Sequence, residues 1–259
     1  MKRKFHKTLV LFSIVCILIL GISSVVFAAY ATSDKKETTV YGYTYMYSAG
    51  VYTNGTYVSA ETAVSCIDQN VPTGYMGAKA RLYDSDANLI LESSWEYNDE
   101  ELAGFNTWTK TYTTSGNYYS FGQVRLYNGD GYNTYSTYKS PIVTLGSSKS
   151  SLLKPRDISN YRYQVNEYGE TYGSNAYADI LGEEPDLVAA IGIDGTHGYV
   201  RSSDLDSPSP RTPEEAIAQN NLGDKLIPLY DKDGRTVIGQ FKIVSGRVGQ
   251  VEYFTDDKN

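Results

Sequence analysis

The stretch Val40-Tyr-Gly-Tyr-Thr-Tyr-Met-Tyr47 decides the fold class of this chain, because tyrosine recurs in it at every second position. Side chains two residues apart on a β-strand point to the same face of the sheet. The pattern therefore predicts a strand that places Tyr41, Tyr43, Tyr45 and Tyr47 on one face.

The residues around this stretch continue the same pattern over positions 34–146. They are rich in Tyr, Thr and Gly, and turn signals recur at short intervals. Short β-branched and aromatic runs between such turns are typical of antiparallel sandwiches. We expect a mostly β fold, with a tyrosine-rich antiparallel β-sandwich over residues 34–146. The turn signals are Ala49-Gly50, Asn54-Gly55, Pro72-Thr-Gly74 and Ser115-Gly-Asn117.

An internal repeat supports paired hairpins in this region. Arg81-Leu-Tyr-Asp-Ser-Asp-Ala-Asn88 matches Arg125-Leu-Tyr-Asn-Gly-Asp-Gly-Tyr-Asn133, with one extra residue in the second turn. Each copy reads as a strand, an Asx-rich turn and a return strand, and two such hairpins suit the facing halves of a sandwich. The positions expected to face the core are Ala80, Leu82, Val124 and Leu126.

The amino-acid composition of the chain changes after position 146. Gly146-Ser-Ser-Lys-Ser-Ser151 is a polar stretch typical of a flexible linker, and we place the linker at residues 146–156. Residues 157–254 contain less tyrosine, and Thr212-Pro-Glu-Glu215 is a capping box with proline at the first helical position. We expect a helix that ends before Gly223, a hairpin over residues 229–243, and a small α+β module as a whole.

The N-terminus predicts export. Four basic residues precede the apolar run 9–20, and Val26-Phe27-Ala28 offers small residues for a signal peptidase. These three parts together define a secretory signal. We expect residues 1–28 to be removed after Ala28 and the protein to be secreted. The alternative is an uncleaved signal that tethers the protein to the membrane.

The charge balance and the counts of cysteine and histidine exclude several classes of partner and of chemistry. Four of the 23 basic residues lie in the leader, so the rest of the chain carries 19 basic against 30 acidic residues, a formal charge of −11. This balance argues against nucleic acid and anionic membrane surfaces as partners. Cys66 is the one cysteine beyond the leader, so no internal disulfide forms, and we expect it to be buried. His197, the one histidine left, reads as a turn residue between glycines rather than a positioned base.

Six segments of the C-terminal third form a group. They are Asn166-Glu-Tyr-Gly-Glu-Thr-Tyr-Gly173, Pro185-Asp-Leu187, Gly198-Tyr-Val-Arg-Ser-Ser-Asp-Leu205, Thr212-Pro-Glu-Glu-Ala216, Ile227-Pro-Leu-Tyr-Asp231 and Val237-Ile-Gly239. Together they resemble a segment of unassigned function that recurs in secreted and membrane-tethered proteins of Gram-positive bacteria. The resemblance implies an exported Gram-positive protein and no catalytic residue. Gly198-Tyr-Val also resembles the closing strand of bacterial SH3-like wall-binding modules.

The sequence offers three candidate sites, each with a structural alternative. The four alternating tyrosines of 41–47 can stack on sugar rings or an extended peptide, or pack in the core. Asp84, Asp86 and Asn88 have the opening spacing of a calcium loop but lack its later glycine and glutamate, which favours an Asx turn. The acidic cluster at 96–101 (Glu96, Asp99, Glu100, Glu101) suits a glycosidase only if two carboxylates face each other across a cleft. A solvated loop is the alternative.

We therefore expect a secreted, non-enzymatic extracellular or cell-envelope protein that needs no cofactor, with Ca²⁺ as the alternative. Its expected partner is cell-wall glycan or a surface or extracellular protein, and its oligomeric state is left open. A secreted carboxylate-based glycosidase is the second hypothesis. A secreted antagonistic or structural factor is the third.

Overall fold

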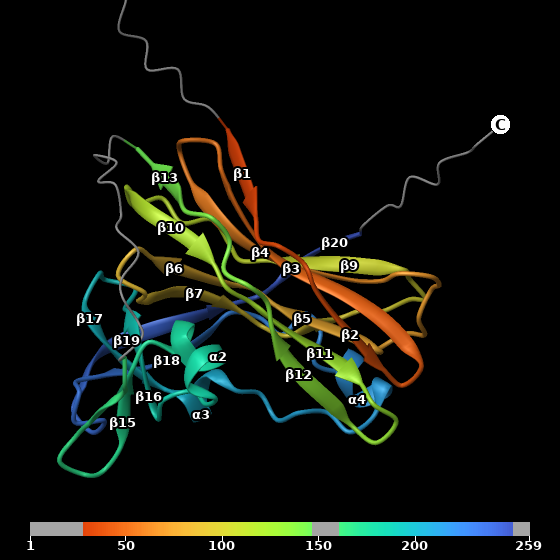
Figure 1. Cartoon of the computed structure of the whole chain (residues 1–259). Helices are drawn as coiled ribbons and strands as arrows, with labels where there is room; N and C mark the ends of the chain where they lie inside the picture. Colours follow the sequence, from red (N-terminus) through yellow and green to blue (C-terminus); the bar gives the residue numbers. More distant parts are fainter. Residues whose placement is uncertain (1–27, 147–160, 251–259) are drawn as a thin grey trace, which may run out of the picture.

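A computed structural model describes residues 28–146 and 161–250 of the chain. They form three β-sheets, with short helices confined to the C-terminal part (Figure 1). This confirms the predicted fold class, a tyrosine-rich antiparallel sandwich followed by a small α+β module. Within the described residues, no helix is long and apolar enough to cross a bilayer. Positions 1–27 of the predicted leader lie outside this part of the chain, and Ala28 is exposed just before the first strand.

One sheet has six strands, and its neighbouring strands are all antiparallel. The strands β1 and β2 lie end to end along one edge of β3, and the order then continues as β3-β4-β9-β20. The last strand, β20, comes from the C-terminal part of the described chain. The bounds are β1 Ala29–Thr32, β2 Lys36–Val40, β3 Tyr43–Thr53, β4 Val58–Cys66, β9 Gly104–Trp108 and β20 Arg247–Gln250.

The alternating tyrosine stretch does not form one continuous strand. Tyr41 and Gly42 have φ values of 51° and 84° and form the two-residue turn between β2 and β3. Turns with two positive φ angles match the twist of the paired strands, and glycine adopts them without strain. The predicted face therefore begins at Tyr43. The prediction that Tyr41 lies on this strand face was wrong, because the chain reverses direction at Tyr41.

A four-stranded sheet, in the order β12-β11-β5-β8, packs against the six-stranded sheet. Its inward residues Val124 and Leu126 lie in one buried cluster with Tyr45, Tyr47 and Phe105. Burial of these large rings is the main stabilising contribution that this half of the sandwich can make. The bounds are β5 Met76–Lys79, β8 Glu96–Tyr97, β11 Gln123–Tyr127 and β12 Tyr132–Ser136.

A ten-stranded sheet runs through both parts of the chain, in the order β13-β10-β6-β7-β19-β18-β17-β16-β15-β14. Its first strands pack against the rest of the six-stranded sheet through Leu82, Tyr118 and Val143. The bounds are β6 Arg81–Asp84, β7 Leu89–Ser93, β10 Gly116–Ser120, β13 Val143–Leu145, β14 Gln164–Val165, β15 Thr171–Gly173, β16 Leu187–Ile191, β17 His197–Arg201, β18 Lys225–Tyr230 and β19 Val237–Val244.

The internal repeat forms two hairpins, β6–β7 and β11–β12, as predicted. The four expected core positions, Ala80, Leu82, Val124 and Leu126, are fully buried. The hairpins do not face each other, however. Leu82 and Val124 both pack against the core face of the six-stranded sheet, so both hairpins belong to the opposite layer of the sandwich.

Strand β7 belongs to the sandwich and to the C-terminal module at once. It pairs in parallel with both β19 and β16, and these pairings close β7, β19, β18, β17 and β16 into a ring. Leu89, Val188 and Phe241 are buried in the core cluster of this ring. The two predicted parts, 34–146 and 157–254, therefore share hydrogen-bonded strands. Apart from Gly146, the predicted linker 146–156 lies outside the described residues.

The helices are short. The capping box is present in α4, where the Thr212 hydroxyl accepts a hydrogen bond from the Glu215 backbone N–H at 3.3 Å and proline occupies the first turn. The regular helix ends at Ile217, earlier than the expected end before Gly223. The helical segments are η1 Asn175–Tyr177, α2 Ala178–Leu181, α3 Ser202–Leu205 and α4 Pro213–Ile217.

Candidate functional site

The outer face of the six-stranded sheet carries a group of accessible aromatic rings. Residues alternate along each strand, so the burial of Val51 and Phe105 in the core directs Tyr52 and Trp108 to the opposite face. Tyr52 and Trp108 are half-buried, and Tyr30 on β1 is 55 % exposed. The solvent-accessible aromatic surface beside a hollow therefore lies on this outer face. It does not include the alternating tyrosines of 41–47.

The hollow has a volume of about 360 Å³, and we call it the outer hollow. Aromatic side chains stand on one side of it, and the last described strand, β20, forms the other. It is lined by Tyr52, Tyr57, Ser59, Trp108, Arg247, Val248 and Gly249. Strand β20 pairs with β9 (Figure 1), so the outer hollow combines residues of the sandwich with residues from the C-terminal end of the described chain.

Strand register sets the arrangement of the rings. Tyr30 lies directly opposite Tyr52, and Trp108 lies between Glu61 and Arg247 on its two neighbouring strands. The ring centroids of Tyr30 and Trp108 are 6.1 Å apart, within the range of favourable aromatic pairs. The rings of Tyr52 and Tyr57 are 5.9 Å apart. Each ring at the site is therefore held by another ring.

A buried carboxylate lies beneath Tyr30. Glu61 is 3 % exposed, and it accepts hydrogen bonds from the Tyr30 hydroxyl and from Asn106 Nδ2, the latter at 2.5 Å. Burial raises the pKa of the Glu61 carboxyl, although both hydrogen bonds lower it. Burial and the hydrogen bond to Glu61 raise the pKa of the Tyr30 hydroxyl. Among the described residues, Glu61 makes no ion pair. Its carboxylate is therefore stabilised by the hydrogen bonds from Tyr30 and Asn106.

Gly50 makes room for this contact. It lies on β3 between Thr32 and Glu61, directly under the Tyr30 ring. A Cβ at this position would lie 2.6 Å from Glu61 Oε2 and 3.0 Å from the Tyr30 ring. Any larger residue would therefore separate Tyr30 from Glu61.

Arg247 supplies a cation at the rim. Its side chain is exposed, and Nη2 donates to the Thr109 carbonyl oxygen at 3.4 Å. Within the described chain it makes no ion pair, so its guanidinium remains available for a carboxylate or phosphate group on a ligand.

Comparisons of the chain with family models, with curated proteins and with solved structures found no match. The properties of the site must therefore be argued from its own residues.

The structure places two of the four alternating tyrosines in the core and packs a third against it. Tyr45 is fully buried and Tyr47 is 5 % exposed, while Tyr43 is half-buried. Tyr41 is 57 % exposed at the turn, where its ring contacts those of Tyr75 and Tyr127. These four rings do not share one exposed plane, which favours the packing alternative over a stacking platform.

The residues of the possible calcium loop form a turn. Asp84 Oδ1 accepts the backbone N–H groups of Asp86 and Asn88, both at 2.9 Å, and its Oδ2 accepts Asn88 Nδ2 at 2.9 Å. This is an Asx turn, and it directs the carboxylate toward its own backbone. Within the described residues, no three His, Cys, Asp or Glu side chains are grouped so that they could hold a metal ion.

The solvated loop predicted as one alternative for residues 96–101 is present only in part. Glu96 belongs to β8 and is fully buried, and its oxygens accept Ser94 Oγ at 2.7 Å and the Asn221 N–H at 3.2 Å. Asp99 and Glu101 are exposed. Burial separates Glu96 from its sequence neighbours, so they do not form a facing pair of carboxylates.

Two further hollows lie elsewhere on the described chain. One of about 420 Å³ lies beside β7 and the β16–β17 turn, with mainly aliphatic walls and Asp194 as its acidic residue. The other, of about 130 Å³, has no acidic wall. None of the three hollows is lined by the two carboxylates that glycoside hydrolysis uses.

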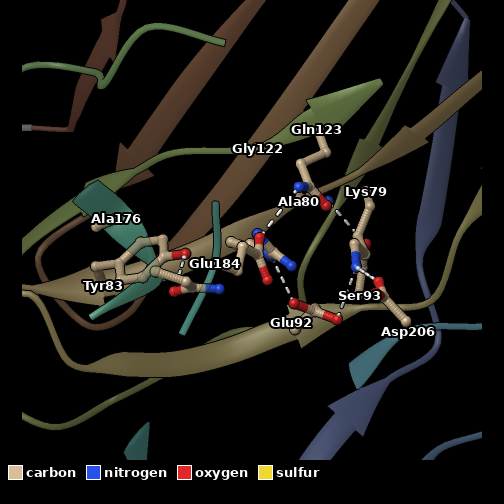
Figure 2. Close-up of polar contacts among 12 residues, drawn as sticks. Lys79, Ala80, Tyr83, Glu92, Ser93, Gly122, Gln123, Ala176, Glu184 and Asp206 are labelled. Atoms are coloured by element: carbon tan, nitrogen blue, oxygen red, sulfur yellow. Dashed lines mark hydrogen bonds and ion pairs between the residues drawn. The ribbon is translucent and has the colours of Figure 1, made fainter. Parts of the chain in front are cut away.

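A cluster of buried charges joins the two parts of the chain (Figure 2). Lys79, Arg81 and Glu92 are at most 1 % exposed, and Glu92 bonds Lys79 Nζ at 3.1 Å and Arg81 Nε at 2.5 Å. From the C-terminal part, Glu184 bonds Arg81 at 2.7 Å and Asp206 lies 3.8 Å from Lys79. Burial alone would lower the pKa of Arg81, but Glu184 and Glu92 raise it.

The residues of the outer hollow were not among the candidate sites predicted from the sequence. Alternation in Gly104-Phe-Asn-Thr-Trp108 indicates that Trp108 and Phe105 lie on opposite faces, which is a usable signal. The pairing of β9 with β20 brings Arg247 to Trp108 across more than a hundred residues, and no local pattern encodes that contact.

Proposed function

We propose that this is an exported, non-enzymatic protein of a Gram-positive bacterium that binds cell-wall glycan in the outer hollow. The observation that carries the proposal is the hollow itself, in which the rings of Tyr52, Tyr57 and Trp108 share the lining with the β20 residues 247–249.

The chemistry of this surface suits sugar rings. A pyranose has an apolar face of C–H groups and a polar edge of hydroxyls. Tyrosine and tryptophan match it, because each offers a rigid apolar ring together with one hydrogen-bonding group. Ser59 and Arg247 add polar groups beside the rings. A protein ligand with an aromatic or acidic side chain is the second class of partner.

The rings are already held in place, which reduces the entropic cost of binding. Tyr30 is fixed by its hydrogen bond to Glu61 and packs beside Trp108. Tyr52 packs beside Tyr57. A preorganised aromatic surface of this kind binds with little loss of side-chain freedom.

The carboxylate nearest the rings supports binding rather than catalysis. Glu61 is covered by Tyr30, and both of its oxygens accept hydrogen bonds from protein groups. A glycosidase needs a carboxyl group that reaches the glycosidic oxygen and a second one across the cleft. Glu61 satisfies neither requirement in this conformation.

The export part of the proposal rests on the leader and on the place of β1. Cleavage after Ala28 leaves Ala29 as the first residue of β1, so Tyr30 stays on the strand that carries it. The C-terminal resemblance to exported Gram-positive proteins agrees with this location. The wall is then the nearest large ligand available to the mature chain.

The test is co-sedimentation of residues 29–259 with purified Gram-positive cell wall. We expect the protein to sediment with the wall, soluble wall fragments to compete, and Trp108→Ala to sediment several-fold more weakly. Tyr41→Ala is the matched control, since Tyr41 is an exposed tyrosine remote from the outer hollow, and it should bind as the parent does. Binding that Trp108→Ala leaves unchanged, or no binding to wall, would overturn the proposal.

A further inference from the structure

Lys79 is a buried nucleophile in the charge cluster. Its side chain is 1 % exposed, and Nζ lies 3.1 Å from Glu92 Oε1 and 3.8 Å from Asp206 Oδ1. The ring of Trp95 lies 5.1 Å from the same nitrogen. Figure 2 shows Lys79 between Glu92 and Asp206, with both carboxylates directed at its amine.

Two features of the surroundings of Lys79 make its ammonium group easier to deprotonate. Burial lowers the pKa of the ammonium, and the positive charge of Arg81 lowers it further, against the opposing effect of Glu92 and Asp206. Glu92 lies at hydrogen-bond distance as a proton acceptor. Asp206 differs from its neighbours in the cluster, because its side chain is 60 % exposed. Its carboxyl group can exchange protons with solvent and release water.

We propose that Lys79 and Asp206 become joined by an amide bond after the chain has folded. The Nζ lone pair attacks Cγ of Asp206, a C–N bond forms, and one C–O bond of the carboxyl group breaks. The two protons that the ammonium loses, the first of them through Glu92, leave with that oxygen as water. The ion pair thus supplies every atom of the amide and of the water, and no oxidant, cofactor or second protein is consumed.

Folding supplies the proximity that the reaction lacks in open solution, and proximity lowers the barrier. Groups held in contact react with effective molarities of about 10⁵–10⁸ M. The amide also removes the positive charge of Lys79 from a buried position, where a charge is unfavourable. The new N–H can keep donating to Glu92 Oε1, so the buried carboxylate does not lose its partner. Glu92 also keeps its contact with Arg81.

The bond would link the two parts of the chain covalently. Lys79 ends β5 in the sandwich, and Asp206 follows α3 in the C-terminal part. Cys66 is the one cysteine outside the leader, so an internal disulfide is not available for this purpose. An amide cross-link of this kind resists reduction.

The test is the intact mass of the purified, denatured 29–259 chain. We expect a mass lower than that of the sequence by one water molecule, and a fragment spectrum in which the peptides containing Lys79 and Asp206 are joined. A full sequence mass would show an ordinary ion pair and overturn the proposal.

Variants locate the loss of mass. Asp206→Ala removes an exposed side chain, so the fold should persist, and the full mass should return. Asp204→Ala, two residues earlier in α3, is the matched control and should keep the loss. A loss that survives in Asp206→Ala would also overturn the proposal, because the missing water would then come from another site.

Discussion

The hydroxyl of Tyr30 on β1 donates a hydrogen bond to the buried carboxylate of Glu61 on β4, across the intervening strand β3. Gly50 on β3 leaves the space in which this contact forms. The contact fixes the Tyr30 ring beside Trp108, so the edge strand β1 helps to position the aromatic surface of the outer hollow.

The burial of Glu61 predicts a pH-dependent contribution to stability. Burial raises the pKa of this carboxyl above its ordinary value of 4.5. The folded state then holds the proton more tightly than the unfolded state, so the free energy of unfolding falls as pH rises from about 4.5 through the raised value. In Glu61→Gln this pH-dependent decrease should disappear.

The measurement is urea unfolding of the parent and of Glu61→Gln at several pH values. The parent should lose stability relative to the variant as pH increases through that window. Glu37→Gln, at an exposed position on β2, is the control and should follow the parent. A parent that gains stability relative to Glu61→Gln over the same window would contradict the buried position of this carboxylate.

Two tyrosines of the alternating stretch should respond in opposite ways to truncation. Tyr45 is fully buried, so Tyr45→Ala should lower the free energy of unfolding by about 3–5 kcal/mol. Tyr41 is exposed at the turn, so Tyr41→Ala should cost under about 1 kcal/mol. Denaturant unfolding of both variants measures the difference. Equal losses would mean that the two rings share one environment.

Cleavage in the predicted linker should not separate the two parts. Limited proteolysis is expected to cut first within residues 146–156, which begin with a run of glycine, serine and lysine and show no periodicity. The two fragments should still elute together on size exclusion in native buffer, because β7 pairs with β16 and β19, and β9 pairs with β20. Separate elution of the fragments would show that these pairings do not hold the parts together.

The local elements of the fold follow from local sequence. Alternation and turn residues predicted the strands and the β6–β7 and β11–β12 hairpins, and Thr212-Pro-Glu-Glu215 predicted the capped start of α4. Each of these features depends on residues a few positions apart. The turn at Tyr41 was missed, because a tyrosine with positive φ is uncommon and the strict alternation masked it.

The candidate site could not be predicted in the same way. It depends on which strands are neighbours, and β20 reaches β9 only after the chain has passed through the C-terminal module. The buried cluster has the same origin, since Arg81 and Glu184 are far apart in sequence. An alternating strand shows that a residue lies outward, but it does not show which residues from other strands will stand beside it.

Tryptophan fluorescence tests the central claim, that the outer hollow binds glycan, most directly. The chain has two tryptophans, and Trp95 is 3 % exposed in the core whereas Trp108 is half-buried at the hollow. Titration with soluble wall glycan should shift the emission of the parent, and Trp108→Phe should leave only the unresponsive Trp95. In Trp108→Ala the loss of one stacking ring, about 1 kcal/mol, should weaken sedimentation with wall several-fold. A glycan-dependent shift that persists in Trp108→Phe, or saturable glycan binding with no shift in the parent, would contradict binding at the outer hollow.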